Sequence, residues 1–134
     1  LHLWDVGTGK RVRSFVNHAG NITGARFLDD GKKAISSDNL GAVRVWDVAT
    51  GKEIRSWSHG GNVNDLEVSP DGKRALTAGY ADRLVKLWDV GRGTALDSFE
   101  GHLSAALGVA FSPDGKQALS CDAIATVRLW RLGR

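Results

Sequence analysis

Histidine is the side chain here best suited to chemistry, because its imidazole can bind a metal or transfer a proton near neutral pH. The chain has four, and three of them recur at similar intervals, at His18, His59 and His102. Ligands of one metal ion must converge on it at about 2 Å. Residues at the same place in successive repeats lie far apart, so these three cannot share an ion. We therefore expect no metal site and no cofactor.

Motifs of catalysis are missing from the sequence. It contains no Gly-x-Ser-x-Gly nucleophile, no glycine-rich phosphate loop and no histidine pair spaced for a zinc-binding helix. The acids at Asp29, Asp30, Asp71 and Asp114 belong to turns that end in Gly. We therefore predict that the chain is not an enzyme and has no catalytic residues.

The elements that position the histidines follow from the spacing of tryptophan. Trp4, Trp46, Trp88 and Trp130 stand 42 residues apart, and a fixed period of about 40 residues is typical of a small unit repeated around a ring. Each unit holds four short, mostly apolar runs bounded by Gly, Asp, Asn or Pro, as expected for short strands. In the middle unit these runs are 53–58, 63–69, 73–78 and 84–90.

The turns between these runs favour antiparallel strands. Ser69-Pro70-Asp71-Gly72-Lys73 recurs as Ser112-Pro113-Asp114-Gly115-Lys116. In such a turn proline presets φ, aspartate bonds its own backbone, and glycine adopts the left-handed conformation. The predicted fold class is therefore all-β and antiparallel.

These features together resemble the WD40-repeat β-propeller family, over nearly all of the 134 residues. Three units end in Trp-Asp, whereas the last ends in Trp130-Arg131. Gly101-His102 matches the family's Gly-His, and Asn17-His18 and Ser58-His59 depart from it. The regular turns are similar to those of repetitive bacterial WD40 arrays. The resemblance implies a partial propeller of about three blades, each of four antiparallel strands.

In this family the blades are out of phase with the sequence unit, which implies a domain organisation. Residues 1–134 are expected to form one partial propeller domain: 1–16 end a blade, 20–58 and 62–100 are complete blades, and 104–132 are a last blade without its outer strand. Because the chain lacks Met and opens within a strand, we expect a C-terminal fragment of a longer propeller. The alternative is a homo-oligomer in which further copies close the ring, since stacked blades bury their faces only against neighbours.

The resemblance also implies that the three histidines are structural. In the family a histidine, a strand hydroxyl, an aspartate from the turn before the tryptophan strand, and the tryptophan form a buried hydrogen-bonded network, which satisfies both imidazole nitrogens. The middle unit has all four by position: His59, Thr77, Asp82 and Trp88. The other two units supply His18, Ser36 and Trp46, and His102, Ser120 and Trp130. Leu40 and Ile124 stand where aspartate is expected. Asp38 and Asp122, two residues earlier, are alternative sources of the carboxylate, but the predicted network does not include them.

For function, the resemblance implies a binding platform. Propellers of this family usually meet protein or peptide partners at a rim of loops, and binding residues commonly lie on loops held by a rigid frame. Interface cores favour Tyr and Arg, so Tyr80 and Arg83 lead the candidates, supported by a one-residue insertion in 80–84. The other candidates are Asn21, Asn39, Asn62 and Leu103.

The predicted function is a non-catalytic interaction scaffold in signalling or assembly, forming part of a larger propeller. Two alternatives stay open. One is a propeller-framed, hydrolase-like enzyme with its site in the missing part, and the other is a nucleic-acid-associated module.

Composition sets further limits. The net charge is +3, but the lysines and arginines are dispersed, so nucleic acid is not the expected partner. No apolar stretch is long enough to span a membrane. The single cysteine, Cys121, cannot form an internal disulfide and fits a reducing compartment. We therefore expect a cytoplasmic protein that does not bind membranes.

Overall fold

Short strands make up almost all of the regular structure in the computed structural model, which describes residues 1–133. The first two strands are β1 (His2–Trp4) and β2 (Arg11–Ser14). The next eight are β3 (Ile22–Leu28), β4 (Lys33–Asp38), β5 (Ala42–Asp47), β6 (Glu53–Ser58), β7 (Val63–Val68), β8 (Arg74–Gly79), β9 (Val85–Asp89) and β10 (Thr94–Phe99). The last three are β11 (Ala106–Phe111), β12 (Gln117–Asp122) and β13 (Val127–Arg131). One 3-10 turn, η1 (Asp29–Gly31), joins β3 to β4.

The strands form four separate antiparallel sheets in chain order. The first sheet has only β1 and β2, the next two have four strands each, β3–β6 and β7–β10, and the last has β11–β13. Each strand pairs with its neighbour in sequence, for example Ala75 with Trp88 across β8 and β9. The all-β, antiparallel prediction is therefore confirmed.

The predicted Asp-Gly turns connect the strands as their residue types require. Gly72 and Gly115 have φ values of +71° and +70°, which glycine adopts without steric cost. In the first of these turns Asp71 Oδ1 accepts hydrogen bonds from the Ser69 hydroxyl at 2.6 Å and from the Lys73 N–H at 3.0 Å. A side chain thus satisfies the backbone where the chain reverses.

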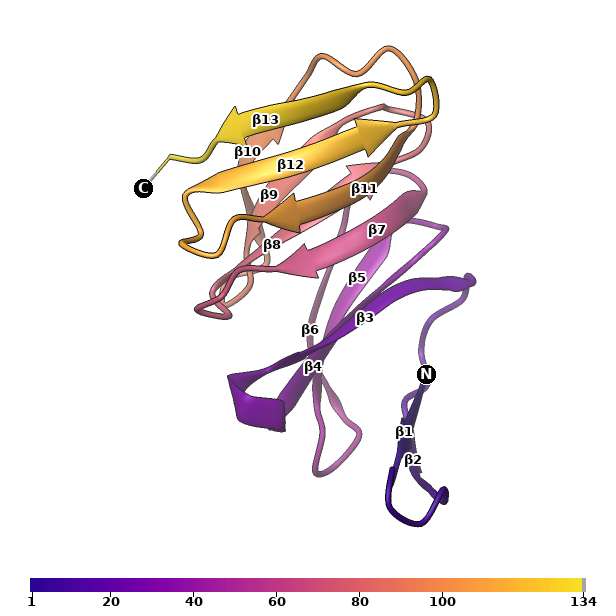
Figure 1. The fold of residues 1–134 in the computed structure, drawn as a ribbon. Coiled ribbons are helices and arrows are strands. Elements are labelled where there is room, and N and C mark those ends of the chain that lie inside the picture. The colour runs from indigo at the N-terminus through magenta and orange to yellow at the C-terminus, as the bar shows by residue number, and fades with distance from the viewer. Residues whose placement is uncertain (134) are drawn as a thin grey trace.

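The sheets stack face to face along the molecule, from β1 and β2 at one end to β13 at the other (Figure 1). Ile35 and Leu66 lie in the apolar layer between β3–β6 and β7–β10, and both are fully buried. Leu76 and Val109 occupy the corresponding layer between β7–β10 and β11–β13. A smaller layer containing Phe15 lies between the first two sheets. Each complete sheet therefore buries both of its faces.

No helix among residues 1–133 is long and apolar enough to cross a membrane.

Candidate functional site

The first complete sheet holds a buried network built from four side chains. His18 Nδ1 lies 2.7 Å from Asp38 Oδ2, and His18 Nε2 lies 2.6 Å from Ser36 Oγ. The Trp46 indole N–H donates to the same Ser36 oxygen at 2.8 Å. Strand β4 carries the hydroxyl and its neighbour β5 carries the indole, and the loop before β3 carries the histidine. All the polar groups are thereby paired, as burial requires.

The last sheet repeats this arrangement with its own residues. His102 Nδ1 lies 2.8 Å from Asp122 Oδ2, and His102 Nε2 lies 2.6 Å from Ser120 Oγ. The Trp130 indole N–H donates to Ser120 Oγ at 2.7 Å. Both the histidine and the aspartate are buried.

In the middle sheet the imidazole is turned around. His59 Nδ1 contacts the Thr77 hydroxyl at 2.7 Å, and His59 Nε2 lies 3.0 Å from Asp82 Oδ2. The Trp88 indole N–H again donates to the hydroxyl, at 2.7 Å. The Asp82 side chain is 28% exposed, whereas its counterparts Asp38 and Asp122 are almost fully buried. Here, therefore, the network extends to the molecular surface.

The extra residue in 80–84 explains this reversal. Gly79 takes the place of Asp38 and Asp122, and the carboxylate comes instead from Asp82 on the far side of the loop. A Cβ atom on Gly79 would lie 1.9 Å from Asp82 Oδ1 and 2.5 Å from His59 Nε2. The absence of a side chain at Gly79 therefore leaves the space through which Asp82 reaches the imidazole.

Asp38 and Asp122 belong to the networks, although the sequence analysis named them only as alternatives and did not include them. Leaving them out was wrong, because both carboxylates contact a histidine. A signal was available in the sequence. Each of these aspartates also holds its own tight turn, since Asp38 Oδ1 accepts from the N–H groups of Leu40 and Ala42 at 3.0 and 2.9 Å. An aspartate that begins such a turn can hold the turn with one carboxylate oxygen and contact the histidine with the other. The carboxylate of the network can therefore come from two residues before the position that is usual in the family.

The same contacts set the charge state of the aspartates. Burial of the Asp38 carboxyl acts to raise its pKa, but the hydrogen bonds from His18 and from the Ala42 and Leu40 N–H groups outweigh burial and lower the pKa. Burial also acts to raise the pKa of Asp82, but the hydrogen bond from the Leu84 N–H and the contact with His59 outweigh burial and lower this pKa. The pKa of His59 itself is lowered by burial, which the Asp82 carboxylate only partly offsets. The middle histidine is therefore held neutral.

The loops predicted to form a binding rim do lie together. The Asn39 N–H donates to the Asn21 carbonyl at 2.9 Å, and the Asn21 N–H donates to Asn39 Oδ1 at 2.8 Å. In the next sheet the Tyr80 N–H donates to the Asn62 carbonyl at 2.9 Å, and in the last sheet Ala123 N–H donates to Ala105 at 3.1 Å. In each sheet, therefore, the loop before the first strand is joined to the loop between the second and third strands.

The predicted rim residues differ in their exposure to solvent and in their hydrogen bonds. Tyr80 and Leu103 are exposed, and Arg83 lies on the surface with a φ of +62°. Asn21 and Asn39 are occupied with each other, and Asn62 has a buried side-chain oxygen without a hydrogen-bond partner in the described part of the chain. Leu40 and Ile124 are exposed on the same loops. Neither was among the partner-binding candidates predicted from the sequence, where both were noted as replacements for aspartate.

The arrangement offers no metal centre within the described residues 1–133, where no three His, Cys, Asp or Glu side chains gather at one point. Several basic side chains are already paired with carboxylates, as in Arg26–Glu67 at 3.2 Å, Lys33–Asp29 at 3.1 Å and Arg44–Glu53. A repeated sheet with a buried His–hydroxyl–Trp chain and a loop rim defines the class of repeat proteins built from propeller blades.

The family comparison agrees with this class. The model of the family described as "WD domain, G-beta repeat" matches residues 9–47, 51–89 and 93–131, and the chain belongs to this family. The prediction of an incomplete WD40-type propeller is therefore confirmed.

Known proteins similar to the chain are WD-repeat proteins. It is 33% identical over 124 residues to a serine-threonine kinase receptor-associated protein of Gallus gallus, which covers 92% of this chain and 35% of that protein. It is 32% identical over 116 residues to a Polycomb group protein of Oryza sativa, covering 83% of this chain and 25% of that protein. It is 36% identical over 72 residues to a transcription initiation factor TFIID subunit of Caenorhabditis elegans, covering 54% of this chain and 11% of that protein. The chain thus spans about a third or less of the length of these relatives.

Proposed function

We propose that the chain acts by binding, as a non-catalytic scaffold whose loop rim receives a protein or a peptide. The observation that carries this proposal is the rim itself, because four exposed apolar or aromatic residues, Leu40, Tyr80, Leu103 and Ile124, stand on its loops. The buried networks fix the bases of these loops. Apolar and aromatic groups presented on a rigid frame are typical of interface cores.

The names of the relatives support a role in assemblies. One is named for its association with a serine-threonine kinase receptor, and another as a subunit of a transcription initiation factor. In the same proposal, the chain is one arc of a larger propeller. Its remaining blades come from the same polypeptide or from further copies.

Selection of peptides from a displayed random library against the full chain tests the rim. The Kd of each selected peptide is measured for the wild type, Tyr80→Ala, Leu103→Ala and the control Leu96→Ala, which removes a similarly exposed side chain from β10. We expect the rim variants to weaken binding about tenfold, and the control to leave it unchanged. Peptides that depend on Leu96 instead, or the failure to enrich any peptide, reject the rim as the binding surface.

A further inference from the structure

The buried network of the middle sheet is connected directly to a loop of the rim. Its carboxylate, Asp82, lies between Tyr80 and Arg83 in the loop that joins β8 to β9. In the other two networks the carboxylates belong to the last residues of β4 and β12, and both are buried. A change at His59 can therefore reach the two leading rim candidates through a single side-chain contact.

The backbone holds Asp82 less firmly than it holds the carboxylates of the other networks. Asp122 Oδ1 accepts hydrogen bonds from two backbone N–H groups, at 3.0 and 2.9 Å. Asp82 Oδ1 accepts one, from the Leu84 N–H at 3.1 Å. The other oxygen of Asp82, Oδ2, lies 3.0 Å from His59 Nε2 and 3.4 Å from Lys86 Nζ. The position of Asp82 therefore depends on side chains as much as on the backbone.

The hydrogen-bond donors and acceptors of this network match a neutral imidazole. The Thr77 hydroxyl accepts the Trp88 indole N–H and donates to His59 Nδ1. The other ring nitrogen, Nε2, carries the hydrogen and donates it to Asp82. A proton added at Nδ1 points at the Thr77 hydroxyl, whose own hydrogen then loses its acceptor. Because a buried donor without an acceptor is unfavourable, protonation breaks the contact between His59 and Thr77.

The charged side chains around the imidazole decide where it moves. Among the described residues they are Asp82 in the loop and Lys86 on β9, whose Nζ donates to the His59 carbonyl at 2.5 Å. The uncharged neighbours are Thr77 of β8, Trp88 of β9 and, in the preceding sheet, the Gly41 carbonyl that accepts the His59 N–H. Burial lowers the pKa of His59, Asp82 partly offsets this effect, and Lys86 adds to it. A protonated ring is therefore drawn toward the partly exposed Asp82 and water.

We propose that His59 is a proton-dependent switch for the rim loop 80–84. When the imidazole gains a proton, it separates from Thr77 and remains paired with Asp82, and the two side chains move toward the surface together. The loop then leaves its closed position, and Tyr80 moves with it. Partner binding at this part of the rim is therefore weaker in acid than at neutral pH. The effect on binding rests on the rim function proposed above, whereas the movement of the loop does not.

Two backbone amides report whether the loop is closed. The Leu84 N–H donates to Asp82 Oδ1 at 3.1 Å, and the Gly79 N–H donates to the Leu84 carbonyl at 2.9 Å. These hydrogen bonds protect the two amides from exchange only while the loop is closed. In the first sheet the Ala42 N–H has the matching place, since it donates to Asp38 Oδ1 at 2.9 Å. It serves as the internal control.

Hydrogen exchange of the full chain without a partner tests the movement. Protection factors, which are corrected for the effect of pH on intrinsic exchange, are measured between pH 7.5 and 5.5. In the wild type we expect the protection of Leu84 and Gly79 to fall about three- to tenfold from pH 6.5 to 5.5. The reason is that an imidazole released from the network binds a proton at about 6.5, whereas burial lowers the pKa in the closed loop. The protection of Ala42 is expected to stay constant.

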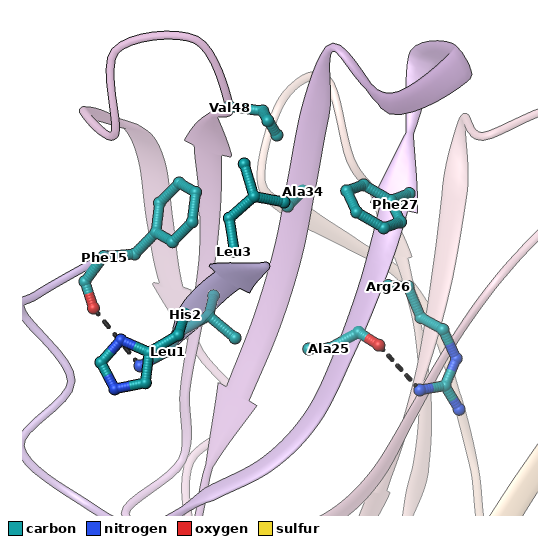
Figure 2. Close-up of a pocket in the computed structure, with 9 residues that line it drawn as sticks. All are labelled: Leu1, His2, Leu3, Phe15, Ala25, Arg26, Phe27, Ala34 and Val48. Carbon is teal, nitrogen blue, oxygen red and sulfur yellow. Dashed lines mark hydrogen bonds between the residues drawn. The ribbon is translucent and has the colours of Figure 1, made fainter. Parts of the chain in front are cut away.

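His59→Gln and His2→Ala are the paired variants. Glutamine is polar but cannot be protonated, so the protection of the loop amides should not change with pH in His59→Gln. His2→Ala removes the exposed histidine of β1, which lies beside the small pocket of Figure 2, and should respond to pH as the wild type does. The proposal is overturned by constant protection of Leu84 in the wild type, by an undiminished loss in His59→Gln, or by an equal loss at Ala42.

Binding shows whether the switch regulates the rim. Histidine-free peptides that depend on Tyr80 in the selection described above are titrated from pH 7.5 to 4.5, and the His59 ring is followed by NMR in the same samples. We expect the wild-type Kd to rise about tenfold for each pH unit below the midpoint of His59, and the Kd of His59→Gln to lack this rise. Equal changes in both proteins, or a ring that stays neutral throughout, contradict the regulation. If no peptide is selected, the rim function fails, and hydrogen exchange still decides whether the loop opens.

Discussion

In each blade, a single hydroxyl group joins the histidine to the tryptophan. Ser36 Oγ accepts the Trp46 indole N–H and lies 2.6 Å from His18 Nε2. The Asp38 carboxylate can only accept a hydrogen bond, so Nδ1 carries a hydrogen and donates it, and in a neutral imidazole Nε2 is then the acceptor of the Ser36 O–H. In the middle blade the Thr77 hydroxyl meets His59 Nδ1 instead, so the neutral imidazole carries its proton on Nε2. The network thus tolerates either tautomer, provided that one carboxylate completes it.

Removal of a network imidazole is expected to destabilise the domain far more than removal of the exposed one. His59→Ala leaves the buried Thr77 O–H without its acceptor and removes one of the partners of the Asp82 carboxylate. Each buried polar group left unpaired costs about 1–3 kcal/mol. His2→Ala, on the exposed first strand, is the control. Urea unfolding of the two variants measures the difference, and equal midpoints would exclude a stabilising role for His59.

The middle histidine also predicts how stability changes with pH. Burial lowers the pKa of His59 in the folded chain, so the unfolded chain binds the proton more readily. Stability from this group is therefore complete above its unfolded pKa of about 6.5, and it is lost as the pH falls toward the lower folded pKa. We expect the free energy of unfolding to fall less between pH 7.5 and 5.5 in His59→Gln than in the wild type. Parallel pH profiles of the two proteins would contradict this.

At the scale of elements, the loop between β8 and β9 depends on one glycine. A Cβ atom at Gly79 would collide with Asp82 and His59. We expect Gly79→Ala to lower the free energy of unfolding by about 1–3 kcal/mol, the usual cost of overpacking a closed site. Gly61→Ala is the control, because a Cβ atom there meets nothing within 4 Å. Thermal unfolding followed by circular dichroism measures both variants. If Gly79→Ala and Gly61→Ala have the same melting temperature, the loop between β8 and β9 accommodates the added methyl group without cost.

The strands could be predicted from the sequence more completely than the loops. The runs expected at 53–58, 63–69, 73–78 and 84–90 agree with β6 to β9 within one residue, because alternation of apolar residues directly reports which side of a strand is buried. The carboxylates of the networks were harder. Asp38 reaches its histidine from the end of β4, and Asp82 reaches its histidine from the middle of a longer loop. The number of residues between an aspartate and the tryptophan does not show which aspartate contacts the histidine. That contact depends on the geometry of the turn and on how far the side chain reaches.

The exposed faces of the end sheets were likewise not visible from residue types. Leu119 and Leu76 are the same residue at the same register position, and their exposures are 49 and 0%. Only the stacking order decides which of them is covered. The periodicity of a sequence reports that a face is apolar, but the neighbouring sheet determines whether that face is buried.

For the whole molecule, neighbouring blades are joined by polar contacts as well as by apolar layers. Asn64 Nδ2 donates to the Ala106 carbonyl at 2.8 Å, and Asp65 Oδ2 accepts the Val109 N–H at 3.0 Å. Both contacts reach from β7 to β11, next to the irregularity between Ala106 and Gly108. They hold the edge of the three-stranded sheet against its neighbour at the point where its own pairing with β12 is interrupted.

Loss of the Asp65 carboxylate is therefore expected to loosen the last sheet without unfolding the others. In Asp65→Ala the Val109 N–H has no acceptor on β7, and a buried donor left unpaired favours local opening. We expect its hydrogen exchange to accelerate about tenfold, while the amides of β4 and β5 keep the wild-type rate. The control is Glu67→Ala. Glu67 is on β7, as Asp65 is, and its removal breaks an exposed ion pair with Arg26 of β3. This variant should leave exchange at Val109 unchanged. Acceleration in every sheet alike would mean that Asp65 stabilises the whole arc, and that its blades open together instead of one by one.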